Sequence, residues 1–166
     1  MQALVPFLAF CQAFGASVGA FAAVWSEIAY LRAMRDGNVS NAEQAHLRII
    51  ARGLRFGMTL LLFSSLGLVI AGYVLAAPLS PALSPSYWIS IALALLIIGV
   101  TWALSRHRIS FALGSALVFS AWWLLAYLTI GQLPALSFGS AVALFVVATV
   151  LFYGLLQYGR FLALRK

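Results

Sequence analysis

Long stretches without a charged residue are the feature that most constrains the fold of this chain. Its Asp, Glu, Lys and Arg residues fall in three blocks, which are 27–55, 106–108 and 160–166. The segments between them carry no such residue: 1–26, 56–105 and 109–159. A helix that crosses the hydrocarbon core of a bilayer needs about 20 apolar residues. The first segment is therefore long enough for one span, and each of the other two is long enough for two.

Two clusters of turn-forming residues divide the longer segments. "APLSPALSPS" at 77–86 holds three prolines, and "GQLPALSFGS" at 131–140 holds Gly131, Pro134 and Gly139. Proline ends a helix because it lacks a backbone donor and clashes with the preceding turn. We therefore predict an all-α integral membrane bundle, a single transmembrane domain over 1–166, with five spans at about 4–34, 53–76, 87–105, 109–130 and 137–162.

The composition agrees with this class. Hydrophobic residues make up 64% of the 166 residues and charged residues 8%, against about 25% charged residues in soluble domains. The ten basic residues, from Arg32 to Lys166, would all lie on one side of a five-span protein. By the positive-inside rule that side is the cytoplasm. We expect a bacterial inner-membrane protein with its N-terminus out and its C-terminus in, and we assign the net charge of +7 to this rule and not to nucleic-acid binding.

Aromatic residues near the predicted span ends fit this frame. Tyr87 and Trp88 open the third span, and Trp122, Trp123 and Tyr127 lie toward the outer end of the fourth. Indole and phenol rings favour the headgroup zone, because they are apolar on one edge and polar on the other. We expect these side chains at the outer interface.

The three acidic residues, Glu27, Asp36 and Glu43, gather in the stretch 20–48. Asp36-Gly37 is a turn signal, and Ser40 with Glu43 has the spacing of a capping box that opens a new helix. The first span, about 46 Å long at 1.5 Å per residue, exceeds a hydrocarbon core of about 30 Å. The first two helices are therefore predicted to extend into a cytoplasmic helical hairpin.

Three arginines, Arg48, Arg52 and Arg55, recur at helical spacing where the second helix enters the membrane. Stacked guanidinium groups can donate pairs of hydrogen bonds to phosphate. They are candidates for binding anionic lipid headgroups or a phosphorylated ligand at the cytoplasmic rim. The alternative is a solvated flank that only obeys the positive-inside rule.

Glu27 is the one carboxylate near membrane depth, which makes it a candidate functional residue. One interpretation is an interfacial ion pair with one of three arginines: Arg55, Arg108 or Arg32. The other is a proton or cation site that is reached from the cytoplasm.

Small and polar residues form a seam on the first helix: Gln12, Gly15, Gly19, Ala23, Ser26 and Tyr30. The second helix carries a similar set: Gly53, Gly57, Ser64 and Ala71. Such residues let helix backbones approach closely, so the two helices are predicted to pack along these faces. A polar permeation path along the seam is the alternative, and it makes Gln12, Ser26 and Tyr30 candidate binding residues.

The two histidines, His46 and His107, could together ligate one haem b if a helix folded onto the membrane surface. No group of Cys, His and carboxylate residues has metal-ligand spacing, and no phosphate loop or nucleophile elbow is present. We predict no catalytic residue, no metal site and no cofactor, with haem b as an alternative.

The stretch 19–73, "GAFAAVWSEIAYLRAMRDGNVSNAEQAHLRIIARGLRFGMTLLLFSSLGLVIAGY", resembles the first two helices of small uncharacterised bacterial multi-pass membrane proteins. It shares a glycine-rich first span, an acidic residue near the end of that span, a "DG" turn and small residues in the second span. These proteins are distantly similar to the copper-resistance D-type membrane proteins. The resemblance implies a small bacterial membrane protein and transfers no site residue, because the spans lack histidines for copper or haem.

Together these patterns predict a non-enzymatic membrane protein that binds or transports a hydrophobic or anionic small molecule or lipid, or acts as an accessory subunit. Its expected partners are membrane lipids, a second copy of itself or a larger membrane complex. Two alternatives remain open: a haem b redox protein that uses His46 and His107, and an oligomeric channel.

Overall fold

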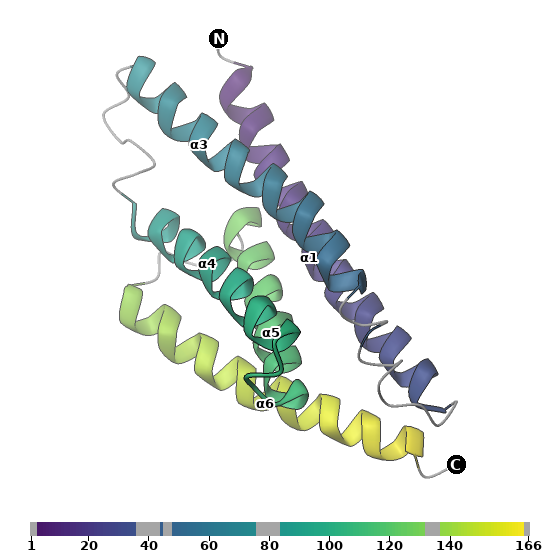
Figure 1. Ribbon diagram of the computed structural model, residues 1–166. Helices are drawn as coiled ribbons and strands as arrows, with labels where there is room; N and C mark the ends of the chain where they lie inside the picture. The colour runs from purple at the N-terminus through teal and green to yellow at the C-terminus, as the bar shows by residue number, and fades with distance from the viewer. Residues whose placement is uncertain (1–2, 36–43, 45–47, 76–83, 132–136, 165–166) are drawn as a thin grey trace.

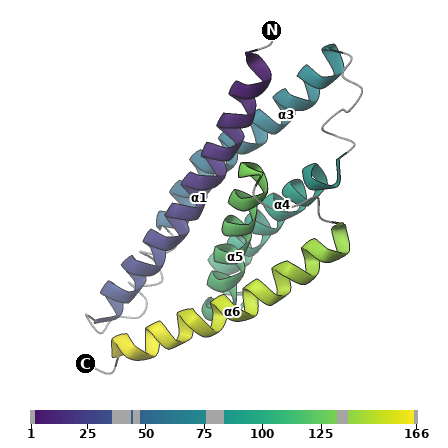
Figure 2. The same ribbon diagram turned by 180° about the vertical axis from the view of Figure 1, so that it is seen from behind.

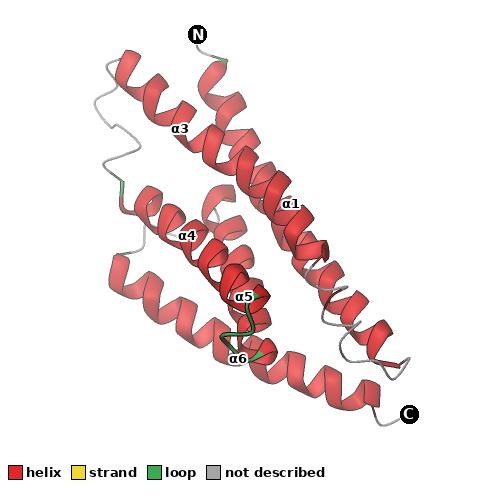
Figure 3. Ribbon diagram, in the orientation of Figure 1, coloured by secondary structure: helices red, strands yellow, loops and turns green. Residues whose placement is uncertain are grey.

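The structure is a computed structural model that describes residues 3–35, 44, 48–75, 84–131 and 137–164. Within these ranges the regular structure is entirely helical (Figure 3). Five of the described helices are long and apolar enough to cross a membrane, which is the number of spans that the sequence predicts. The hairpin predicted between the first two spans, with its Asp36-Gly37 turn and Ser40–Glu43 cap, lies outside the described residues.

The first two spans lie side by side along most of their length (Figure 1). Helix α1 covers Leu4–Arg35. Its neighbour begins with helical residues 48–53, continues through the π-helix η1 (Leu54–Met58) and ends as α3 (Thr59–Val74). The second apolar span therefore extends from Arg48 to Val74 without a break.

Glycines bring these two helices into backbone contact. A Cβ added to Gly15 would lie 2.8 Å from the carbonyl oxygen of Gly57, and one added to Gly57 would lie 2.7 Å from the carbonyl oxygen of Gly15. At Gly53 an added Cβ would lie 2.4 Å from the Cβ of Ala22. These distances leave no room for a methyl group, so the predicted close packing of the two helices is confirmed at Gly15, Gly53 and Gly57.

The π-helix η1 coincides with this close approach. Single π-helical turns insert an extra residue into an α-helix and are uncommon. Gly57, whose backbone touches Gly15, belongs to η1, and the backbone N–H of Thr59 closes the turn on the carbonyl oxygens of Arg55 and Phe56. The irregular turn is thus part of the α1 interface.

Trp122 is a core residue and not the interfacial anchor that the sequence analysis expected. Its side chain is only 1% exposed. A Cβ on Gly19 would lie 2.1 Å from two atoms of the Trp122 ring, and one on Gly57 would lie 3.4 Å from it. The indole therefore fills the space that glycines leave between α1, η1 and α5. The preference of tryptophan for the headgroup zone did not predict this position, because it takes no account of which residues face the bundle.

The remaining helices are α4 (Pro85–Ser105), α5 (Phe111–Ile130) and α6 (Phe138–Leu164). Helix α5 lies at the centre, in contact with α1, α4 and α6 (Figures 1 and 2). Small residues permit this: a Cβ on Gly114 of α5 would lie 2.5 Å from Leu104 of α4. In contrast, α6 exposes most of its apolar side chains.

The helix ends fall at the predicted turn clusters. Helix α4 begins with Ser84 as N-cap, whose hydroxyl accepts from the Tyr87 N–H at 3.3 Å, and with Pro85 in its first turn. Helix α5 ends at Gly131, which has a φ of 74° and takes the left-handed cap that glycine tolerates. The two chain ends lie at opposite ends of the bundle (Figure 1).

Candidate functional site

Glu27 forms an ion pair inside the bundle with Arg160 of the last helix. The two residues are only 5% and 6% exposed. Nη2 of Arg160 donates to both carboxylate oxygens of Glu27, at 3.1 and 2.9 Å, and to Oγ of Ser115 at 2.7 Å. The site therefore joins α1, α5 and α6 through one guanidinium group.

Two aromatic rings lie beside the guanidinium. Its Cζ lies 4.8 Å from the ring centroid of Tyr30 and 5.2 Å from that of Phe111. The two rings also stack on each other with centroids 4.6 Å apart. Cation–π attraction is strongest where water is excluded. The rings stabilise the positive charge of Arg160, and the carboxylate of Glu27 pairs with it.

Of the two interpretations of Glu27 from the sequence, the structure shows the ion pair, but with a different partner. Glu27 pairs with Arg160 and not with Arg55, Arg108 or Arg32. The two residues are 133 positions apart, and Arg160 was counted among the positive-inside residues of the C-terminal block. One feature of the sequence could have pointed to Arg160 as a buried partner. This arginine follows a long apolar run and precedes four more apolar residues, Phe161, Leu162, Ala163 and Leu164.

Tyr30, a predicted site residue, thus belongs to the Glu27 site, but Gln12 and Ser26 do not. Nε2 of Gln12 donates to Oγ of Ser65 at 2.9 Å, which links α1 to α3. The hydroxyl of Ser26 is fully buried and donates to the carbonyl oxygen of Ala23 at 2.7 Å. Gln12 also lines a small cavity of about 140 Å³ near the N-terminal end of α4.

The three candidate arginines Arg48, Arg52 and Arg55 are all exposed. Arg52 and Arg55 lie together at one surface depression of about 520 Å³. The described residues that complete this depression are Phe56, Thr59, Leu60 and Phe63. We call it the arginine groove. Arg52 and Arg55 border it, its lining surface is almost wholly apolar, and Arg48 is not among its lining residues.

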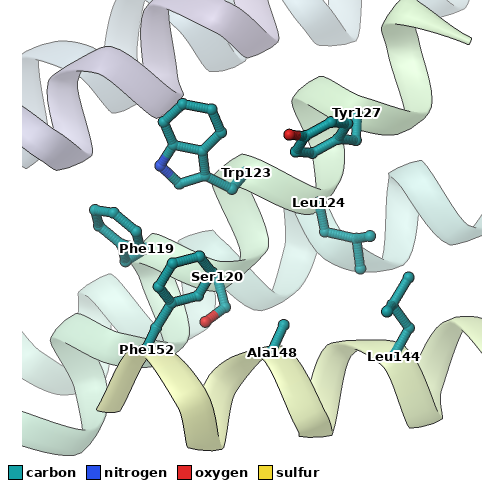
Figure 4. Close-up of a pocket in the computed structure, with 8 residues that line it drawn as sticks. All are labelled: Phe119, Ser120, Trp123, Leu124, Tyr127, Leu144, Ala148 and Phe152. Atoms are coloured by element: carbon teal, nitrogen blue, oxygen red, sulfur yellow. The ribbon is translucent and has the colours of Figure 1, made fainter. Parts of the chain in front are cut away.

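A second groove lies between α5 and α6 and was missed by the sequence analysis. Its volume is about 490 Å³. Four aromatic side chains line it, Phe119, Trp123, Tyr127 and Phe152, together with aliphatic residues such as Leu144 and Ala148 (Figure 4). We call it the aromatic groove. Residue spacing could not reveal it, because the two helices meet through tertiary packing and not through a sequence motif.

The described residues offer no metal centre. They contain no group of three or more His, Cys, Asp or Glu side chains that could hold a metal ion. His107 is exposed in the turn between α4 and α5, with a φ of 54°. His46 lies outside the described residues, so the haem b alternative stays a prediction.

Comparison with family models, curated proteins and solved structures finds no match to this chain. The resemblance to copper-resistance D-type membrane proteins therefore stays a prediction.

Proposed function

We propose that this protein is a non-enzymatic membrane protein that binds an anionic phospholipid in the arginine groove. The observation that carries the proposal is the pairing of Arg52 and Arg55 with an apolar wall in one depression. An anionic phospholipid has the matching shape, with a negative phosphate at one end and hydrocarbon chains behind it. The proposal assigns no part in this binding to Glu27, whose carboxylate is paired with Arg160.

The chemistry of the groove suits both parts of such a lipid. Guanidinium groups bind phosphate oxygens through paired, charge-assisted hydrogen bonds. The side chains of Phe56 and Phe63 are 58% and 70% exposed, which gives an acyl chain an apolar surface to lie on. Among the described residues, neither Arg52 nor Arg55 forms an ion pair that would compete with a phosphate.

Other arginines distinguish the groove from a generally positive surface. Arg106 and Arg108 both lie over the Trp102 ring, at 5.0 and 5.6 Å, and Arg32 lies 5.8 Å from the Trp25 ring. These arginines carry the same charge but are engaged by tryptophan. They supply a matched control for an experiment on Arg52 and Arg55.

Removing both groove arginines should abolish preferential binding of anionic lipid. We expect Arg52→Ala/Arg55→Ala to weaken retention of phosphatidylglycerol about 30-fold, from about 1 kcal/mol for each arginine. Native mass spectrometry of protein released from micelles, with phosphatidylglycerol and phosphatidylcholine in competition, measures this retention.

The control variant Arg106→Ala/Arg108→Ala removes the same charge and should keep the preference. An equal loss in both variants would mean that bound lipid responds only to net charge. An unchanged preference in Arg52→Ala/Arg55→Ala would refute the arginine groove as the site.

We also propose that the basic end of the bundle faces the cytoplasm of a bacterial inner membrane. In this orientation the N-terminus lies on the outer side. An alkaline phosphatase fused after Ser84 should be active, and one fused after Arg106 should be silent, because this phosphatase folds only outside the cytoplasm. Equal expression of both fusions is the control. The reverse pattern would place the arginine groove at the outer surface.

A further inference from the structure

We propose that the aromatic groove between α5 and α6 binds an uncharged lipid whose head is a planar ring with carbonyl groups, that is, a lipid of the quinone class. The groove shares no lining residue with the arginine groove. The inference therefore stands apart from the anionic phospholipid proposed above.

An unused hydrogen-bond donor belongs to one of the residues that line the groove. Within the described residues, Nε1 of Trp123 is buried and has no hydrogen-bond partner. A buried donor without an acceptor is costly and uncommon in folded proteins. Tyr127 lies one helical turn further on, lines the same groove and is 50% exposed. Trp123 and Tyr127 thus place an indole N–H and a phenol O–H in two neighbouring residues of the groove, and each of these groups can donate to a carbonyl oxygen.

The shape and polarity of the groove lining also favour a planar, uncharged ligand. None of the described lining residues is charged, and four of them are aromatic. Aromatic rings pack best against other planar rings, in offset or edge-to-face arrangements. The ring centroids of Phe119 and Trp123 are 6.3 Å apart, and those of Phe119 and Phe152 are 4.9 Å apart. Figure 4 shows the nitrogen edge of Trp123 on the side of Phe119, so the proposal requires that the bound ring displace the Phe119 side chain to accept from the indole N–H.

The depth of Trp123 along α5 excludes the ester groups of phospholipids as the hydrogen-bond acceptor. Helix α5 has 20 residues, which gives it about 30 Å, the thickness of the hydrocarbon core. Trp123 lies seven residues before the end of α5 at Ile130, or about 10 Å inside the helix end. Phospholipid esters remain at the edge of the hydrocarbon. A quinone head is uncharged and can carry its carbonyl oxygens to the depth of Trp123.

The test is equilibrium binding of decyl-benzoquinone to the detergent-solubilised full-length protein, with decylbenzene as the matched ligand without carbonyls. We expect saturable binding of the quinone and at least about fivefold weaker binding of decylbenzene, since the latter makes no hydrogen bond. Trp123→Phe keeps an aromatic ring but removes the donor, and should weaken quinone binding about fivefold. Ala148→Trp fills the groove and should abolish binding.

Trp88→Phe, a change at an exposed residue of α4, is the matched control and should leave quinone binding unchanged. Thermal unfolding of each variant establishes that it is folded, and Tyr127→Phe replaces Trp123→Phe if that variant is not. Equal affinity for decylbenzene and the quinone would overturn the proposal. So would displacement of the quinone by an equimolar diacyl phosphatidylcholine, or binding that survives Ala148→Trp.

Discussion

Arg160→Ala is expected to lower the free energy of unfolding by about 3–5 kcal/mol, because it removes the guanidinium group that pairs with the buried carboxylate of Glu27. The arginine joins α1, α5 and α6 through Glu27, Ser115 and two aromatic rings. All of these contacts disappear together. Unfolding by sodium dodecyl sulfate in mixed micelles, followed by tryptophan fluorescence, measures the loss.

Two further variants separate this buried pair from ordinary surface charge. Arg106→Ala removes an exposed arginine that lies over Trp102, and should cost no more than about 1 kcal/mol. Glu27→Leu/Arg160→Met replaces the pair by apolar side chains and should recover most of the loss, as apolar replacements of buried pairs commonly do. If Arg160→Ala costs no more than Arg106→Ala, the ion pair does not hold the three helices together.

Gly19→Ala should destabilise the protein by about 1–3 kcal/mol, the usual cost of overpacking a core. The new Cβ would lie 2.1 Å from two atoms of the Trp122 ring. The ring is almost fully buried and cannot turn aside without moving α1 or α5. The same unfolding measurement in mixed micelles applies.

Gly99→Ala is the matched control, and its effect should have the opposite sign. Gly99 lies in α4 with nothing within 4 Å of an added Cβ, so alanine should stabilise the helix by about 0.5–1 kcal/mol. A double-mutant cycle with Trp122→Leu tests the cause. In that background Gly19→Ala should no longer be destabilising, and an undiminished cost would mean that Trp122 is not what excludes the methyl group.

Much of the helical framework follows from the sequence because the bilayer restricts the choices. Charge-free length predicts the number of apolar helices, and the proline and glycine clusters predict the ends of α3, α4 and α5. The contact of Gly15 with Gly57 was also predictable, since small residues at helical spacing have few other uses in a membrane.

The candidate site was less accessible, because its contacts are remote in sequence. No spacing rule connects Glu27 with Arg160, and charge counting assigned Arg160 to the cytoplasmic rim. Trp122 was misplaced for a related reason: amino-acid type indicates a preference for the interface, but the facing helix decides whether a ring is buried. The aromatic groove depends on how α6 crosses α5, which neither helix encodes alone.

The π-helical turn at Leu54–Met58 has a consequence for how this span tolerates changes in length. An extra residue in a helix rotates everything after it relative to everything before it. The turn therefore sets the angular offset between exposed Arg52 on one side and buried Ser64 and Ser65 on the other. The residues before the turn and those after it face their present surroundings only while this angular offset is preserved. A one-residue insertion or deletion here would reorient half a span, whereas substitutions at its exposed positions leave the orientation intact.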